Sequence, residues 1–281
     1  MAGLGWRARA ELLDGVPVQP EKEKPTRLAE HGNSEGERRR FGGRAVGEAD
    51  SSCGFGEGAG GFARRNVGSL EILGEVFLKD LNYDFQSLPE SIGNFKSMMI
   101  LEVVDVNIVD LPTVGRLRRL KCLLLLGSWL ERLPEAFGDM QSLVELDPSK
   151  ASITKLRDSF GNLKNLQCLS LRSCRKIEKV PNPFGDLKSL YELDISYSGL
   201  VQLPDSIEKL KELKAIKMSG CNIHELPSPI GSMRKLEMLD TPSSLKGEIP
   251  SQIGRFSSLR VLVLSRTKIC LLPSTIRIYD R

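Results

Sequence analysis

Three glycines near the amino terminus have the spacing of a dinucleotide-binding loop. Gly56, Gly58 and Gly61 match Gly-x-Gly-x-x-Gly, a pattern in which helix amides hold a pyrophosphate. That chemistry requires a buried strand before the glycines and a helix after them. The surrounding tract is glycine-rich and shows neither helical nor strand periodicity. The pattern therefore predicts no nucleotide site, and no Gly-x-x-x-x-Gly-Lys-Ser/Thr loop occurs anywhere in the chain.

Residues that bind metals or act as nucleophiles are scarce. The chain has two His and six Cys, and Cys168 and Cys174 stand apart from any second pair or nearby His, which makes a zinc site unlikely. Cys174 and Cys221 occupy the same small position of a sequence repeat, so packing explains them better than chemistry. His224 is expected in a solvated loop. We therefore expect no enzyme activity, no metal site and no cofactor.

A repeat of 22 to 24 residues organises most of the chain. An apolar residue followed by Pro marks each unit, and one mark lacks its Pro. Periods of 20–29 residues with a Leu-x-x-Leu-x-Leu core are the signature of leucine-rich repeats. The marks are Leu88-Pro89, Leu111-Pro112, Leu133-Pro134, Leu156-Arg157, Val180-Pro181, Leu203-Pro204, Leu226-Pro227, Ile249-Pro250 and Leu272-Pro273.

Residues 213–236 show how one unit is built. Leu213, Ile216 and Met218 point inward from a short strand, so the residues between them face outward. Pro227 has no amide donor, so it ends this segment and starts the return of the chain. One unit cannot bury its apolar face alone, whereas stacked units bury a continuous core. The sequence thus predicts an α/β solenoid, a leucine-rich-repeat horseshoe of about 8–9 repeats, with short parallel strands on the concave face and an irregular, 3-10 or short helical convex side.

Composition changes sharply near residue 66. Residues 1–66 hold 13 of the 26 Gly and no Ile or Tyr. Because so few apolar residues cannot offset the entropy of ordering the backbone, we predict a disordered leader there. Residues 67–281 form the predicted repeat domain. Within it, 67–88 fits the template poorly and is interpreted as a degenerate first turn, and the last repeat is interpreted as truncated.

Charge is small in total and separates by face. The net charge is +4, and no apolar run reaches the ~18 residues that a membrane helix needs. Nucleic-acid binding would require interleaved aromatic residues and a strong positive total, and both are missing. Basic residues stand just before the strands, on the convex side, as a solvated face or a dock for an acidic partner domain. They are Lys96, Arg118, Lys164, Lys188, Lys211 and Arg234.

Two columns of outward residues line the expected concave face. Residues of one column in neighbouring repeats lie roughly 5 Å apart, as in any sheet ladder. The middle column is Glu102, Leu124, Asp147, Ser170, Asp194, Lys217, Asp240 and Val263. The column before it is Ile100, Cys122, Glu145, Cys168, Glu192, Ala215, Met238 and Val261. Together they predict an acidic centre between two apolar ends.

The sequence leaves two interpretations of this face open. Acids alternate with other residues along the middle column, which keeps like charges from lying opposite one another and needs no partner. Exposed apolar residues such as Leu124, Leu126 and Val263 favour a surface that binds a protein partner. The predicted partner-binding residues are Glu102, Leu124, Glu145, Asp147, Glu192, Asp194, Lys217, Asp240 and Val263.

Several repeat phrases carry a family resemblance over residues 90–281. They include Leu-Pro-Glu-Ser-Ile-Gly (88–93), Leu-Pro-Asp-Ser-Ile (203–207), Leu-Pro-Ser-Pro-Ile-Gly (226–231) and Leu-Pro-Ser-Thr-Ile (272–276). This sequence resembles the repeat domain of plant nucleotide-binding leucine-rich-repeat disease-resistance proteins, most closely the TIR-bearing class. No TIR or nucleotide-binding domain accompanies the repeats.

The resemblance implies a non-catalytic recognition module of a plant defence response, located in the cytoplasm. Its partner would be a pathogen effector, a guarded host protein or the missing nucleotide-binding domain, and neither nucleic acid nor a membrane is expected. Plant Ras-group proteins and animal Ras-signalling scaffolds share the phrase Leu-Pro-x-x-Ile-Gly-x-Leu. The alternative is therefore an intracellular Ras-group-type signalling scaffold.

Overall fold

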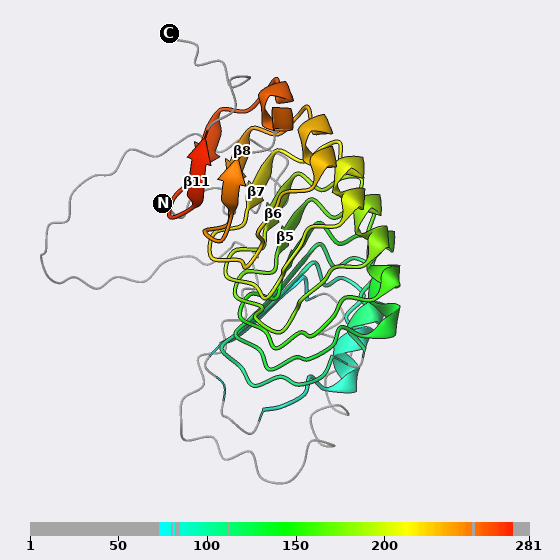
Figure 1. The fold of residues 1–281 in the computed structure, drawn as a ribbon. Coiled ribbons are helices and arrows are strands. Elements are labelled where there is room, and N and C mark those ends of the chain that lie inside the picture. The colour runs from blue at the N-terminus through cyan, green and yellow to red at the C-terminus, as the bar shows by residue number, and fades with distance from the viewer. Residues whose placement is uncertain (1–72, 80, 82–84, 112, 249–250, 272–281) are drawn as a thin grey trace, which may run out of the picture. The chain divides into compact units, whose positions relative to one another are not determined.

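The computed structural model describes residues 73–79, 81, 85–111, 113–248 and 251–271. Within them, nine parallel strands form one sheet in the order β1-β2-β3-β4-β5-β6-β7-β8-β10 (Figure 1). Strand order follows chain order, so each repeat pairs only with the repeats before and after it, as in a solenoid. The predicted disordered leader, the glycine motif at 56–61 and the truncated end at 272–281 lie outside the described residues.

Each repeat contributes one strand to the main sheet. The strands are β1 Glu75–Lys79, β2 Ile100–Val104, β3 Cys122–Leu126, β4 Glu145–Asp147, β5 Cys168–Ser170, β6 Glu192–Asp194, β7 Ala215–Lys217, β8 Met238–Asp240 and β10 Val261–Val263. The segment interpreted as a degenerate first turn supplies β1. This strand pairs with β2 in parallel over all five of its residues, from Glu75 opposite Ile100 to Lys79 opposite Val104.

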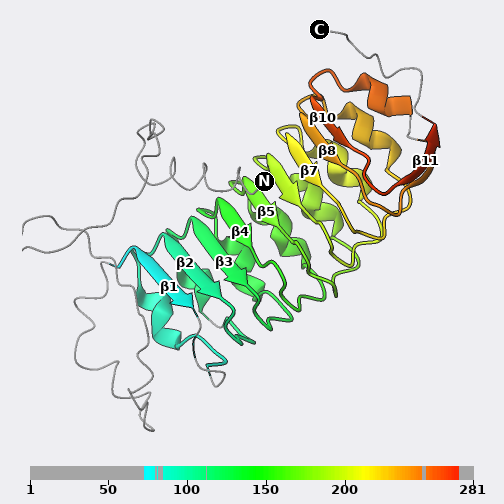
Figure 2. The same cartoon turned by 90° about the vertical axis from the view of Figure 1, so that its left-hand side faces the viewer.

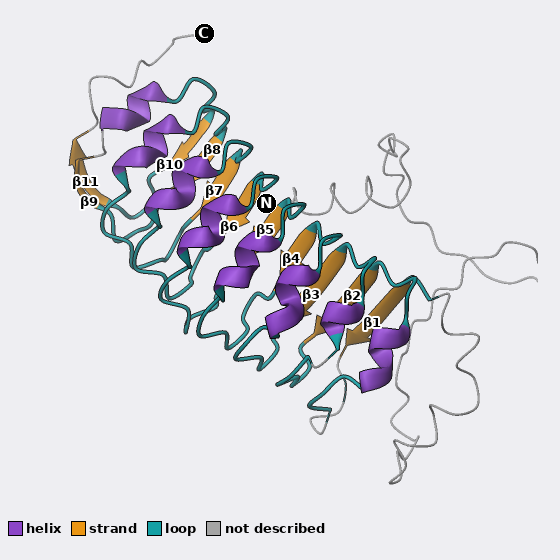
Figure 3. Ribbon diagram, turned by 90° about the vertical axis from the view of Figure 1, so that its right-hand side faces the viewer, coloured by secondary structure: helices purple, strands orange, loops and turns teal. Residues whose placement is uncertain are grey.

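Short 3-10 helices form the layer behind the sheet (Figure 3). They are η1 Glu90–Asn94, η2 Val114–Arg116, η3 Glu135–Asp139, η4 Asp158–Asn162, η5 Asn182–Asp186, η6 Asp205–Lys209, η7 Ser228–Ser232 and η8 Ser251–Arg255. The Pro of the apolar-Pro marks is the N-cap of η1, η3, η5, η6 and η7, where its missing amide leaves no bond unmade. Arg157 takes this place before η4 with an extended backbone, so the repeat without Pro keeps the geometry. Both predicted layers are confirmed.

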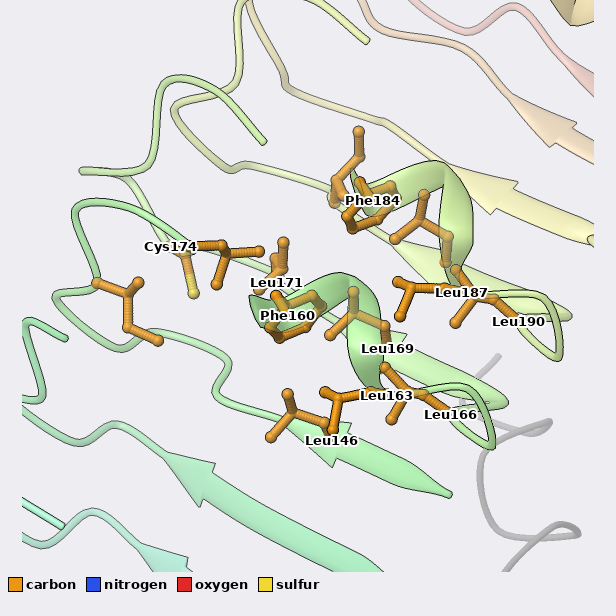
Figure 4. Packing of buried hydrophobic residues seen from close by; sticks show 14 of the residues in the cluster. Leu146, Phe160, Leu163, Leu166, Leu169, Leu171, Cys174, Phe184, Leu187 and Leu190 are labelled. Atoms are coloured by element: carbon orange, nitrogen blue, oxygen red, sulfur yellow. The ribbon is translucent and has the colours of Figure 1, made fainter. Parts of the chain in front are cut away.

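A continuous apolar core fills the space between the two layers (Figure 4). Phe137, Phe160 and Phe184 stack along it, with successive ring centroids 6.4 Å apart and ring planes 2° apart. The inward residues predicted for the unit at 213–236 are confirmed, since none is more than 6% exposed. They are Leu213, Ile216, Met218, Cys221, Ile223 and Leu226.

Basic side chains on the convex side bond to the carboxyl-terminal ends of the 3-10 helices. Lys164 Nζ donates to the Gly161 carbonyl oxygen at 2.7 Å and to that of Asp186, one repeat away, at 3.3 Å. Lys188 makes the matching bond at 3.0 Å in the next repeat. Gln141 stands in its repeat where most of the others have a basic residue, and its side-chain amide donates the equivalent bond to the Gly138 carbonyl oxygen at 2.8 Å. Because helix ends leave carbonyl groups without partners, these donors stabilise the convex layer, and the positions of Lys164 and Lys188 are explained without a docking partner.

The repeat that contains β8 and the repeat after it also form a second, smaller sheet that the sequence does not predict. Strand β9, Lys246–Glu248, pairs in parallel with β11, Lys268–Leu271. Strand β9 follows β8 in its repeat and β11 follows β10 in the next, so the two extended segments run side by side outside the main sheet. Among the described residues, no helix is long and apolar enough to cross a bilayer.

Candidate functional site

The strands of the main sheet lie side by side in chain order (Figure 2), and their register places both predicted columns in the predicted order. In the middle column, Glu102 lies opposite Leu124, Leu124 opposite Asp147, Ser170 opposite Asp194, Asp194 opposite Lys217, Lys217 opposite Asp240 and Asp240 opposite Val263. Glu145 and Glu192 lie in the other column, each opposite Cys168. The nine residues predicted from the sequence therefore share one face of the sheet.

The apolar end of this face on β2 and β3 is buried, which corrects the sequence prediction. Leu124 is 8% exposed, and Ile100 and Cys122 are 3% and 2% exposed. The three form a cluster that is separate from the main core, because cross-strand side chains in register pack on one another. Glu102 is also buried, with Lys79 Nζ 3.0 Å from its carboxylate. At the opposite end, Val261 is exposed and Val263 is half-buried.

Asp147 and Asp194 close the turns that follow their strands. The Ser149 backbone N–H donates to Asp147 Oδ1 at 2.9 Å, and the Ser196 backbone N–H donates to Asp194 Oδ1 at 2.8 Å. An Asp that accepts a bond from the amide two residues later replaces a backbone turn contact. These two carboxylates thus have a structural function that their place in the column does not reveal.

The remaining acids of the face also have partners within the protein. Lys217 Nζ lies 2.6 Å from Glu192 Oε1, and both side chains are largely shielded from solvent. Lys217 therefore forms its ion pair with a residue of the neighbouring column, although Asp194 and Asp240 lie on either side of it in the middle column. The Ser219 hydroxyl lies 2.8 Å from both carboxylate oxygens of Asp240. The alternation of charges thus contributes to the stability of the sheet face itself.

Burial disfavours the charged form of two acids on this face. Desolvation raises the pKa of Asp147, although hydrogen bonds from Ser149 and Ser170 act in the opposite direction. Desolvation likewise raises the pKa of Asp240, opposed by the bond from Ser219. Both carboxylates are consequently easier to protonate than an exposed Asp.

The raised pKa predicts that Asp147→Asn removes part of the pH dependence of stability. The amide oxygen still accepts the Ser149 N–H bond, whereas the titrating group is gone. Because the pKa of Asp147 is higher in the folded protein than its ordinary value of 3.8, the folded protein holds this proton more tightly than the unfolded chain does. The resulting stabilisation is fully present below pH 3.8 and is lost as the pH rises through the raised pKa. The free energy of unfolding of the native sequence, relative to the variant, should therefore fall as pH increases. Urea titrations from about pH 3 to pH 7 measure this difference, and a difference independent of pH contradicts the prediction.

The thiols near the site are packing groups, as predicted for the corner positions. Cys174 and Cys221 are buried, and their sulfur atoms donate to the carbonyl oxygens of Pro148 at 3.1 Å and Ile195 at 2.8 Å. Burial raises the pKa of Cys174 to about 12 and that of Cys168 to about 11. Little thiolate, the nucleophilic form, exists near neutral pH at such values. In the part of the chain that the structure describes, no group of three His, Cys, Asp or Glu residues could hold a metal ion.

Two exposed residues beside the columns are not predicted from the sequence. The Arg172 guanidinium lies over the Tyr197 ring, 5.0 Å from its centroid, and its Nη1 is 3.9 Å from Asp194 Oδ2. Both residues follow the strands and so lie outside the two columns. One signal in the sequence is available, because Gly127 and Gly220 occupy the position of Tyr197 in other repeats.

A family profile described as "Leucine-rich repeat region" matches residues 114–199. No curated protein sequence matches the chain significantly. Among solved structures, a leucine-rich-repeat protein of Leptospira interrogans superposes with a TM-score of 0.58 and 26% sequence identity. That similarity covers 68% of this chain and 55% of the Leptospira chain, so the chain spans about half the length of that protein.

Two further structures have the same fold at lower identity. The plant peptide hormone receptor RGFR1, solved in complex with RGF2, gives a TM-score of 0.52 at 24% identity over 73% of this chain and 38% of the receptor chain. The leucine-rich-repeat domain of the type III effector XopL gives 0.52 at 20% identity over 72% of each chain. These similarities agree with the repeat period and the strand order in showing a leucine-rich-repeat solenoid.

Proposed function

Because the chain contains a leucine-rich-repeat domain, we propose that it is a non-catalytic module that recognises a protein partner on its concave face. The observation that carries this proposal is the register of the two columns. Strand pairing holds their side chains at roughly 5 Å intervals, which presents a preorganised surface to a partner. The described Cys residues of this region are packing groups, so recognition is a better explanation of the face than chemistry.

We assign the direct contacts to the residues of the face that are only partly buried. Glu145, Glu192 and Asp240 supply negative charge to a basic segment of the partner, with Lys217 between them and Val263 at the apolar end. Asp147 and Asp194 add to the negative potential while they close the turns. Glu102 and Leu124 are buried, so they support the face rather than contact a partner.

We further propose that the module acts in a plant defence response in the cytoplasm. The support is the resemblance of repeat phrases such as 88–93 and 203–207 to those of plant resistance proteins. The partner is then a pathogen effector, a guarded host protein or a nucleotide-binding domain. Since Ras-group scaffolds share the same phrases, a host signalling protein is the second candidate.

Site-directed photo-crosslinking tests the proposed face. A photoreactive amino acid replaces either Ala215, a small residue on the concave strand β7, or Lys209, an exposed residue on the convex helix η6. We expect adducts in plant cytosol from position 215 and several-fold fewer from position 209. Mass spectrometry of the adduct separates a resistance-type partner from a signalling protein. Adducts that form only from position 209 contradict the proposal.

A further inference from the structure

An arginine and a tyrosine project together from the edge of the sheet where the central strands end. Arg172 follows β5 by two residues, and Tyr197 follows β6 by three. The Arg172 side chain is 51% exposed and Tyr197 is 47% exposed. Their 5.0 Å stacking contact joins two neighbouring repeats. Arg and Tyr are among the residues that contribute most to protein interfaces.

The backbone at Tyr197 does not need this side chain. Tyr197 has φ of 58°, in the left-handed region, where a bulky residue is strained. The same turn position in other repeats holds Gly127 and Gly220, with φ of 71° and 74°, and also Asp105, Lys150, Ser173 and Arg266, with φ between 51° and 63°. Glycine therefore satisfies the turn with less strain. The left-handed turn recurs in several repeats, so what distinguishes this repeat is the exposed aromatic ring that its turn carries.

The following repeat leaves space for the tyrosine ring. A Cβ atom on Gly220 would lie 2.4 Å from Tyr197 Cδ1 and 2.6 Å from Cε1. The ring therefore lies close to the bare backbone of Gly220 and also contacts the Arg172 guanidinium. Arg172, Tyr197 and Gly220 form a surface across three repeats, which we name the Arg–Tyr platform.

Arg172 and Lys150 are exposed cations at this edge, while Asp105, in the corresponding turn of the β2 repeat, is an exposed acid. The nearest carboxylate to Arg172 is that of Asp194, which is 3.9 Å away and already accepts the Ser196 N–H bond. A guanidinium has five N–H donors, so one long contact leaves most of them available to a ligand. Lys150, at the position of Tyr197 two repeats earlier, is also exposed. A planar cation beside an aromatic ring suits a carboxylate that is attached to an apolar stem.

We propose that the Arg–Tyr platform binds an acidic segment of a protein partner. A carboxylate of the segment pairs with the guanidinium of Arg172, and the adjoining apolar atoms pack on the ring of Tyr197. The platform borders the concave columns at the Arg172–Asp194 contact, but it attracts an acidic group, whereas the column acids attract basic groups. The proposal therefore does not depend on the function of those columns.

Peptide selection on the full chain tests the platform. We expect a random 12-residue display library to yield peptides rich in Asp and Glu, and synthetic copies of the strongest binders provide the probe. Their dissociation constants should increase about tenfold or more with Arg172→Ala and with Tyr197→Gly. Tyr197→Gly should fold, because glycine occupies this turn at positions 127 and 220. Lys211→Ala removes an exposed cation outside the platform and should change the constant less than about twofold.

Each outcome of the selection decides the proposal. Acidic peptides that need Arg172 and Tyr197, but not Lys211, support it. Acidic peptides that bind all the variants equally overturn it, because their attraction is then general, and so does a selection without acidic peptides. Basic peptides whose binding is lost with Glu145→Gln and Glu192→Gln would overturn the platform while supporting the proposed function of the columns.

Discussion

Gly161→Ala is expected to destabilise the repeat array by about 3 kcal/mol or more, the upper end of the range for overpacking. An added Cβ would lie 2.3 Å from the Pro183 carbonyl oxygen and 2.7 Å from Pro183 Cβ. Pro183 belongs to the next 3-10 helix, η5, so the contact is relieved only if the two helices separate. Separation would also loosen the core that these repeats share. Urea unfolding followed by circular dichroism measures the loss.

Gly93→Ala is the matched control in η1. There the added Cβ would meet Thr113 at 3.0 Å, a contact that a small adjustment relieves. We expect the control to lose less than half as much stability as Gly161→Ala. Glu208 occupies the matched position of η6, so the close approach is a property of particular helix pairs. Equal effects of the two substitutions would contradict the steric explanation.

Phe160→Ala is expected to reduce the free energy of unfolding by about 3–5 kcal/mol. Phe160 is 2% exposed and is the middle ring of the stack, with Phe137 and Phe184 each 6.4 Å away. Its removal leaves a cavity between two repeats, and neither neighbouring ring can fill it without losing its own contacts. Chemical denaturation of the variant and of the native sequence measures the difference.

Phe160→Ile separates lost volume from lost stacking. Ile207 and Ile230 occupy the same position in η6 and η7 and are fully buried, so the fold accepts this side chain. We expect Phe160→Ile to lose well under half of the stability that Phe160→Ala loses. If the two variants are equally stable, the filled volume at position 160 is not what stabilises these repeats.

The period of the sequence predicts the fold and the columns for one physical reason. An apolar residue at a fixed place in each repeat must face the shared core, and this determines the register of all neighbouring strands. Asp194 opposite Lys217 follows from that register alone. Arg157 shows that a missing Pro matters little, because its extended backbone starts η4 equally well.

The contacts of individual polar side chains could not be predicted in the same way. Lys164 looks like a solvated base in the sequence, but its ammonium group bonds to carbonyl oxygens in two different repeats. Strand alternation predicts that Leu124 points away from the main core, and so it looks exposed in the sequence. Alternation does not show that neighbouring side chains on the same face cover it. The left-handed turn at Tyr197 has no local signal, since the residue is not Gly, Asn or Asp.

Crosslinking from position 215 in proteins with and without the concave acids tests the central claim most directly. Glu145→Gln and Glu192→Gln together remove two negative charges from the column that contains Ala215 while keeping side-chain size; Glu192 lies opposite Ala215 and Glu145 lies three strands away from it. Glu225→Gln on an exposed corner is the control. We predict that the double variant loses most of the adduct, because a basic segment of the partner is no longer attracted, and that the control keeps it. An adduct of unchanged yield in the double variant would contradict recognition through the acidic concave face.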